Sequence, residues 1–480
     1  MSPKTKQAAD PMTEAVKGAT AAFDEVIEQA LKQFHNPSWL SDHSPLASPY
    51  FLGSACPSRL QPPVWTLVRG QALQQLLMEA ADSMLQQQAR WGQLWRDLLQ
   101  ASYFSPVPLP VYRIIHELHT SEAAYHRHRN AAIHHLGEAL IRLVKPALRL
   151  ESVSPPVMLV GREEIITPLL AALHEGKAVS MSGAGGVGKT TLGQALAHRF
   201  APETTFWYTF APGLNDRSHS LLFALAYFLH GQGVSTLWLQ LVADRGAIKE
   251  DVALNLLRYD CANLGQRRVL LCFDEIDLLR PGENEAHTHL IPLLESLRGL
   301  VPLLCVGQKA VIETDLHQPL NGLARPDMAT LLQQAGLVLT QDELAHLHSY
   351  TQGNPRLLQL FIALANSLQR TGETAATAIT NALTSFAHEP SLEFLLRRIW
   401  RHLNESEMVL LELLAVFRNA APRAAWNDQA QQTAIDQLIR WQLVQANEQG
   451  AFICCRRCAM PSIKTSWSMK RKSCCIWKRP

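Results

Sequence analysis

The chain has 480 residues, of which 47% are hydrophobic and 18% are charged, and its formal net charge is +2. This composition is typical of a globular, cytoplasmic protein of about three or four domains. No apolar run approaches the ~18 residues of a membrane span, and residues 1–16 lack the apolar core of a secretory signal. The four cysteines before residue 454 are scattered, which argues against a disulfide framework and favours a reducing compartment.

Residues 1–150 are expected to form an all-α N-terminal region. Apolar residues recur at helical spacing over 12–35 and 65–101. Loops that contain proline and serine separate these stretches.

A candidate helix-turn-helix lies in residues 107–145. Its first helix carries an apolar stripe, and Thr120 or Ser121 is placed to cap the second helix. Basic residues stand near the start of the second helix, where a recognition helix meets DNA. The alternatives are a helical adaptor with solvated basic residues and a zinc site built from histidines. The stripe is Val111, Ile114, Ile115 and Leu118, and the basic residues are His126, Arg127, His128 and Arg129.

Residues 151–320 alternate between strand and helix patterns. Stretches 269–275 and 301–307 are continuous apolar runs, as expected of buried parallel strands, and 204–211 is rich in β-branched and aromatic residues. We therefore predict an α/β P-loop NTPase domain, in which a parallel sheet carries helices on both faces.

The stretch 183–190 satisfies the pattern G-x-x-x-x-G-K-[ST] and lies between a predicted strand and a predicted helix. Backbone N–H groups and the helix N-terminus are expected to cradle nucleotide phosphates. Lys189 is placed to reach the β- and γ-phosphates, and the hydroxyl of Thr190 to bind Mg²⁺. The predicted nucleotide-binding residues of this loop are Gly183, Ala184, Gly185, Gly186, Val187, Gly188, Lys189, Thr190 and Thr191.

An acidic pair follows the buried strand VLLCFDE. Asp274 is expected to hold the Mg²⁺ through water, and Glu275 to polarise the attacking water as a general base. The next strand ends at Gln308 and Lys309, either of which is a candidate sensor of the γ-phosphate. An ordinary polar strand end is the alternative. The expected metal ligands are therefore Asp274 and Thr190 of the loop.

Two further segments complete the predicted order. Residues 321–388 are expected to form a helical lid, and 389–453 carry amphipathic helices over 406–417 and 432–442, followed by a short ribbon. Two helices followed by a ribbon indicate a winged helix. Its expected core is Leu410, Leu411, Leu414, Ile435, Leu438 and Leu443.

Residues 454–480 contain eight Lys and Arg and no acidic residue. Codons for Cys and Trp begin with TG, so a shifted reading frame turns each such position into Leu, Met or Val. One codon choice in that frame yields acidic and apolar residues at helical spacing. We therefore expect a frameshifted, non-native tail. A solvated basic tail, or a metal or nucleic-acid site that includes Cys455 and Cys458, is the alternative.

Two short motifs flank the predicted sheet. Residues 160–164 read VGREE and precede the first strand, and residues 353–356 read GNPR and open a helix of the lid. Together with the P-loop, the Asp-Glu strand end and the winged helix, this order resembles the STAND class of P-loop signalling ATPases. That class includes NB-ARC and NACHT proteins and is related to AAA+ ATPases. The resemblance covers about residues 157–453.

The resemblance implies roles for residues of both motifs. Val160 and Gly161 would line the adenine pocket, and Arg162 would lie near the nucleotide. Pro355 would pack on the nucleotide from the lid. Arg356 occupies the place where AAA+ relatives have a phosphate-sensing arginine, which makes it a candidate catalytic residue.

The chain departs from the family pattern at two places. The usual arginine after the fourth strand is replaced by residues 307–309. The pair Asp274-Glu275 resembles the AAA+ form more than the paired aspartates of many NB-ARC proteins, which indicates real hydrolysis.

The sequence therefore predicts an ATPase switch that holds ATP and Mg²⁺ between the P-loop domain and the lid. It is expected to hydrolyse ATP to ADP slowly and to form a homo-oligomer in the ATP state. A metabolic enzyme such as a kinase is disfavoured, because nothing resembles a substrate pocket beside the P-loop. Two other classes stay open. One is an AAA+ ATPase acting on DNA, like transposition or replication loaders, and the other is a regulator that binds nucleotide and DNA without hydrolysis.

Overall fold

The computed structural model describes most of the chain between residues 11 and 454. None of the described helices is long and apolar enough to cross a membrane. The predicted tail lies outside the described residues from 455 onward. The described residues are 11–48, 50–53, 64–87, 91–144, 150–153, 159–211, 216–265, 267–279, 285–370, 372–388, 403–416, 421, 425, 426, 428–440, 443–446 and 452–454.

The chain divides into two compact units. Unit 1 comprises Met1–Leu150 and Asn215–Arg268, and unit 2 comprises Glu151–Leu214 and Val269–Pro480. The domain predicted at 151–320 therefore contributes to both units. Three helices inserted between its second and third strands belong with the N-terminal helices.

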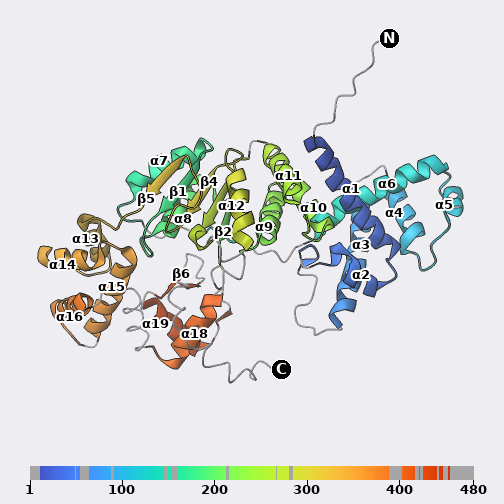
Figure 1. Cartoon of the computed structure of the whole chain (residues 1–480). Helices are drawn as coiled ribbons and strands as arrows, with labels where there is room; N and C mark the ends of the chain where they lie inside the picture. The colour runs from blue at the N-terminus through green and yellow to red at the C-terminus, as the bar shows by residue number, and fades with distance from the viewer. Residues whose placement is uncertain are drawn as a thin grey trace, which may run out of the picture. The chain divides into compact units, whose positions relative to one another are not determined.

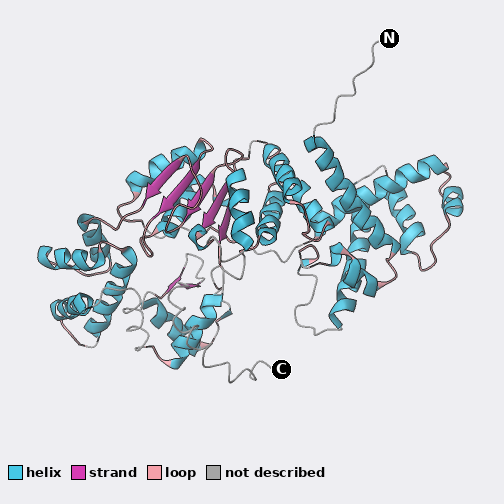
Figure 2. Cartoon of the chain, viewed as in Figure 1, coloured by secondary structure: helices cyan, strands magenta, loops and turns pink. Residues whose placement is uncertain are grey.

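In its described part, unit 1 contains helices and no strand (Figure 2). Aromatic side chains join its two chain segments, since the ring of Phe51 lies 5.8 Å from that of Phe23 and 5.7 Å from that of Trp238. All three rings are buried, so the inserted helices share the N-terminal core. The helices are α1 (Pro11–Lys32), α2 (Pro37–His43), α3 (Val64–Gln87), α4 (Gly92–Leu99), α5 (Val111–Glu117), α6 (Glu122–Leu143), α9 (Ser218–Gly231), α10 (Thr236–Ala243) and α11 (Glu250–Ala262).

The stretch 65–101, where apolar residues recur at helical spacing, contains two helices, α3 and α4. The second begins at Gly92, close to the backbone of the first. A Cβ at Gly92 would lie 2.6 Å from the carbonyl oxygen of Met84, so glycine permits a close approach that other residues would block. Because apolar spacing continues on both sides, the pattern alone does not reveal this break.

Helices α5 and α6 form the pair predicted in the N-terminal region. The turn between them contains His119, whose backbone is left-handed with φ of +46°. Ser121 caps α6, because its hydroxyl accepts the N–H of Ala124 at 3.2 Å. Ile114 of α5 and Tyr125 of α6 are buried in a small common core.

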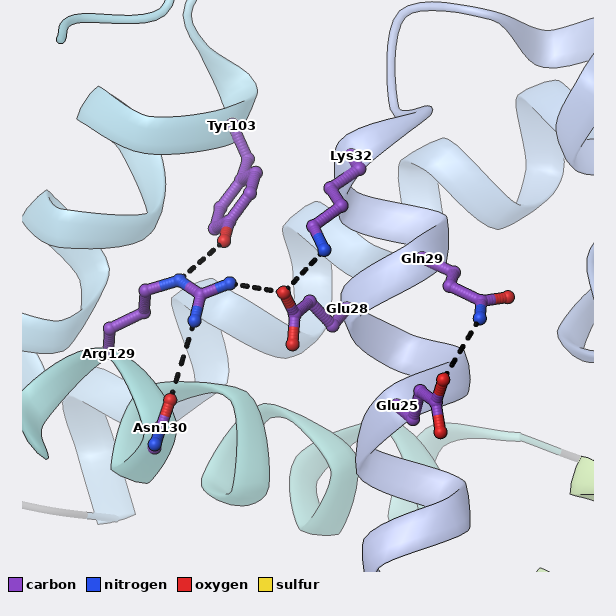
Figure 3. A network of polar contacts seen from close by, with 7 residues as sticks. All are labelled: Glu25, Glu28, Gln29, Lys32, Tyr103, Arg129 and Asn130. Carbon is purple, nitrogen blue, oxygen red and sulfur yellow. Dashed lines mark hydrogen bonds and ion pairs between the residues drawn. The ribbon is translucent and has the colours of Figure 1, made fainter. Parts of the chain in front are cut away.

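A polar network fastens α6 to α1 (Figure 3). The guanidinium of Arg129 donates to the carboxylate of Glu28 and, at 2.8 Å, to the hydroxyl of Tyr103. Lys32 forms a second ion pair with Glu28 at 2.7 Å. The hydrogen bond from Lys32 and the nearby Arg129 hold the pKa of Glu28 below its ordinary value, although burial opposes them.

Unit 2 contains a five-stranded parallel sheet in the order β2-β3-β4-β1-β5 (Figure 1). Helices α7 and α8 share a buried core with residues of one face, such as Val179 and Leu304. Phe206 and Phe273, which point the other way, are also buried, so the sheet is covered on both faces as predicted. The elements are α7 (Glu163–His174), β1 (Ala178–Ser182), α8 (Lys189–Phe200), β2 (Thr205–Thr209), β3 (Leu270–Asp274), α12 (Glu285–Ser296), β4 (Leu303–Val306) and β5 (Leu316–Pro319).

Among the residues that the structure describes, four helices follow the sheet, and then two helices and an antiparallel two-stranded ribbon, the order expected of a lid and a winged helix. The five leucines and one isoleucine predicted as the winged-helix core are all buried, in one cluster with lid residues such as Leu358 and Phe361. The elements are α13 (Arg325–Gln334), α14 (Gln341–Thr351), α15 (Pro355–Arg370), α16 (Ala375–His388), α18 (Glu405–Val416), α19 (Gln429–Arg440), β6 (Val444–Ala446) and β7 (Phe452–Cys454).

Candidate nucleotide-binding site

Three strand ends of the sheet come together at the candidate site. β1 leads into the predicted P-loop, β3 ends at Asp274, and β4, which lies between them, ends just before Gly307. Because the strands are parallel, their carboxyl ends lie at the same edge of the sheet. In open α/β sheets this edge is where ligands bind.

The P-loop connects β1 to α8, and it turns at glycines. Gly186 and Gly188 have φ of +82° and +96°, a region that disfavours residues with a Cβ. The loop ends at Lys189, the first residue of α8, so the N–H groups of that helix end face the loop. This strand–loop–helix order confirms the predicted context of the motif.

Lys189 lies across the loop that precedes it. Its side-chain ammonium donates to the carbonyl oxygens of Gly183 at 2.9 Å and Ala184 at 3.0 Å. The residue is 9% exposed, so the cation is held inside the curve of the loop. This position suits a cation that binds the outer phosphates of a nucleotide.

Thr190 and Asp274 meet directly, as the predicted metal site requires. The threonine hydroxyl donates to a carboxylate oxygen of Asp274 at 3.0 Å. Burial raises the pKa of Asp274 to about 7, the neighbouring Glu275 adds to this rise, and the bond from Thr190 opposes it. A buried carboxyl group beside a hydroxyl and a second carboxylate fits Mg²⁺, which favours oxygen ligands and would neutralise this crowded negative charge.

Glu275 is half-buried and has an uncommon backbone conformation. Its φ is +55° and its ψ is +34°, the left-handed region, and its N–H donates to Asp274 at 2.9 Å. A non-glycine residue there costs on the order of 1–3 kcal/mol and tends to occur at functional sites. This twist of the backbone at the strand end was not visible in the sequence.

Gln308 is exposed, and its backbone joins two strand ends. Its N–H donates to the carboxylate of Asp277 at 2.7 Å, and its carbonyl accepts the N–H of Gly183 at 3.3 Å. The adjacent Lys309 is also exposed. Asp277, which sequence reasoning missed, is the last residue of the DEID run and ties the end of β3 to the turn after β4.

Arg162 is buried and contacts backbone carbonyls. Its guanidinium donates to Asn321 at 2.6 Å and to Val187 at 3.5 Å. Burial lowers the pKa of Arg162, and the carboxylate of Asp327 in α13 opposes this shift. The residue therefore connects the P-loop to the segment that enters the lid. Val160 is half-buried beside it.

The GNPR turn lies against the P-loop. The N–H of Arg356 donates to the carbonyl of Gly186 at 3.2 Å, and the amide of Asn354 donates to Gly185 at 2.9 Å. Pro355 is half-buried between these two residues at the start of α15. The backbone of Arg356 thus lies beside the loop, and its guanidinium donates to Gln359 of the same helix at 3.0 Å. Its phosphate-sensing role stays a prediction, and Asn354 was not singled out from the sequence.

The basic residues predicted on α6, in unit 1, separate into two kinds. His126 and Arg127 are exposed, whereas His128 packs on Trp91 at 5.0 Å and Arg129 is held in the network of Figure 3. Within the described residues, no group of three or more His, Cys, Asp and Glu side chains is placed to hold a metal ion.

Comparisons with known proteins find similarity in three-dimensional structure alone, since no family model and no curated protein matches the chain. A STAND protein with a tetratricopeptide repeat sensor from Pyrococcus horikoshii is 18% identical, with a TM-score of 0.43 over 65% of this chain and 43% of that one. A Walker-type ATPase of Pyrococcus abyssi is 14% identical, with a TM-score of 0.36 over 64% and 96% of the two chains. The Orc1 protein of Aeropyrum pernix, in complex with DNA, is 13% identical, with a TM-score of 0.34 over 66% and 95%.

The parallel sheet, the P-loop after β1 and the buried Asp274 beside Thr190 define a P-loop NTPase fold. The match spans less than half the length of the Pyrococcus horikoshii protein.

Proposed function

We propose that this chain is an ATP-binding and ATP-hydrolysing switch of the cytoplasm, with ATP and Mg²⁺ held between the P-loop and the lid helix α15. One observation carries the proposal, namely that the lid bonds to the backbone of the P-loop through Arg356 and Gly186. A nucleotide on the loop therefore lies within reach of the lid. Loss of its γ-phosphate changes the interactions that favour one lid arrangement over another.

Each residue of the site has its own role in ATP binding and hydrolysis. Lys189 binds the β- and γ-phosphates, and Glu275 accepts a proton from the water that attacks the γ-phosphorus, so that ADP and phosphate leave. Mg²⁺, when bound by Thr190 and Asp274, supplies positive charge that stabilises the phosphate oxygens. Arg356 binds the outer phosphate from the lid side.

The lid and the winged helix share one core, which supports the passage of a lid movement to the C-terminal helices. Leu358 of α15 and Leu410 of α18 belong to the same buried cluster. On the other side of α18, Val409 and Leu413 are 51% and 45% exposed, one helical turn apart. We take this apolar pair as a candidate surface for the homo-oligomer of the ATP state.

The test replaces Glu275 by Gln. We expect the variant to bind ATP as the wild type does and to hydrolyse it about 100-fold or more slowly, since a general base contributes about 10²–10⁴-fold. Single-turnover hydrolysis and ATP retention measure the two properties, and light scattering with ATP or ADP measures assembly. Equal ATP lifetimes for wild type and variant would instead support the regulator that does not hydrolyse.

The second candidate is an ATPase that acts on DNA. It is favoured by the exposed His126 and Arg127 near the start of the capped helix α6. ATP hydrolysis with and without duplex DNA separates the candidates. Strong stimulation by DNA favours the DNA-acting ATPase, and an unchanged rate favours the switch.

A further inference from the structure

The side chain of Asn354 makes two different contacts with its two ends. Its amide nitrogen donates to the carbonyl of Gly185 in the P-loop at 2.9 Å. Its amide oxygen accepts the N–H groups of Arg356 at 3.0 Å and Leu357 at 3.4 Å, which caps the N-terminus of α15. One planar amide therefore joins the phosphate loop to the first turn of the lid helix.

The backbone of the P-loop lies close to the turn that carries Asn354. A Cβ added to Gly186 would lie 2.8 Å from the Cβ of Arg356 and 3.0 Å from the amide oxygen of Asn354. On the opposite side, the carbonyl of Gly353 accepts the N–H of Leu323 at 2.7 Å. The turn that carries Asn354 is therefore bonded to the P-loop and to the segment that leads into α13.

The peptide geometry gives these contacts a consequence inside the loop. A trans peptide is planar, and its C=O and N–H point to opposite sides. The bond from Asn354 to the Gly185 carbonyl therefore orients the N–H of Gly186. The bond from the Arg356 N–H to the Gly186 carbonyl likewise orients the N–H of Val187. Both N–H groups belong to the loop that is expected to cradle phosphates, and the N–H of Val187 donates to the carbonyl of Ala184 in that loop at 3.3 Å.

We propose that Asn354 is a positioning residue through which the lid sets the orientation of the backbone N–H groups of Gly186 and Val187 in the P-loop. The inference rests on the proposed function and names how lid and phosphate site are coupled. An amide is suited to this role because it donates at one end and accepts at the other. A carboxylate of the same shape accepts at both ends.

The substitutions Asn354→Asp and Asn354→Ala separate coupling from capping. Asp keeps the acceptor for the N–H groups of α15 but places an acceptor against the Gly185 carbonyl, whereas Ala removes both interactions. The matched control is Thr340→Ala, which removes the capping box that Thr340 forms with Glu343 at the start of α14. That cap belongs to another helix of the same lid.

The first measurement is the affinity for a fluorescent, non-hydrolysable ATP analogue. We expect Asn354→Asp and Asn354→Ala to weaken binding about five- to tenfold, the value of roughly one hydrogen bond, and Thr340→Ala to change it less than twofold. The second is hydrogen exchange at the Val187 amide of the P-loop without nucleotide, which should become faster in Asn354→Asp and stay unchanged in Thr340→Ala.

The outcomes distinguish the two proposals. If wild-type affinity and exchange persist in Asn354→Asp, or if Thr340→Ala has an equal effect, the coupling through Asn354 is wrong. If the wild type binds no ATP analogue while exchange at Val187 still becomes faster in Asn354→Asp, the coupling holds and the nucleotide switch fails.

Discussion

Lys189 and Arg129 are basic residues on two helices, α8 and α6, and the sequence marks both as candidates for binding phosphate. Lys189 donates to the neutral carbonyl oxygens of its own loop, and its charge also lowers the pKa of the nearby Asp274. Arg129 binds the carboxylate of Glu28, a full negative charge from another helix. Neutral carbonyls yield readily to a phosphate, whereas a carboxylate already neutralises the cation. The charge of the hydrogen-bond partner therefore distinguishes the two cations.

The difference between the two cations should show most strongly in the ATP affinity of a Lys189 variant. Replacement by Ala should weaken ATP binding about 100-fold, because charge-assisted bonds to two phosphates are lost, worth about 3 kcal/mol. The melting temperature without nucleotide should change little. Titration calorimetry and thermal unfolding measure the two quantities. Near-wild-type ATP affinity in this variant would remove Lys189 from the phosphate site.

Replacing Arg129 by Met should lower stability and leave ATP affinity unchanged, the reverse of what is expected for Lys189. The free energy of unfolding should fall by about 2 kcal/mol, because Glu28 loses one of its two cationic partners in a partly buried position. ATP affinity should not change. Urea unfolding at neutral pH tests this, and a drop in ATP affinity without loss of stability would contradict the structural role.

The exposed neighbour Arg127 supplies the matched control for Arg129. Arg127→Met should leave stability unchanged. If α5 and α6 bind DNA, it should weaken DNA binding about three- to tenfold at low salt, because one phosphate contact is lost. Arg129→Met should bind DNA as the wild type does, once its lower stability is taken into account. Equal DNA binding by wild type and Arg127→Met would favour the adaptor interpretation.

A smaller effect is expected in acid. Because the pKa of Glu28 is lower in the folded chain than in the unfolded one, its carboxylate stabilises the fold at pH values above the unfolded pKa. This contribution is lost as pH falls through the folded value, below about pH 4.5. Glu28→Gln should therefore lose less stability than the wild type between about pH 6 and pH 3. Parallel pH dependences would show that Glu28 does not contribute.

Much of the fold could be predicted from local pattern. The P-loop needs glycines such as Gly188 for positive φ, and the apolar strands need a covered sheet, so both leave a direct mark on the sequence. The residues predicted from helical spacing as the winged-helix core are also buried. The division of the chain into two units could not be predicted in this way. Helical spacing in 216–262 indicates only that these helices bury one face, and not which core they join.

Apart from Arg162 and Arg356, which the family resemblance implied, the candidate site was predictable where residues act through their own backbone neighbourhood, and not where they act across the fold. Lys189 and Thr190 are placed by the loop that contains them, and Asp274 by the end of its strand. Asn354 and Gly185 are 169 positions apart, and Arg129 and Glu28 are 101 apart.

The amino-acid sequence by itself determined that this protein has a phosphate loop, an acidic strand end and helices in a set order. Backbone dihedral preferences and apolar periodicity act over a few residues. The tertiary structure decided which helices share a core, which cation meets a carboxylate and which side chain of the lid reaches the loop. Packing brings distant segments together, and the partner that each polar group meets there sets its role.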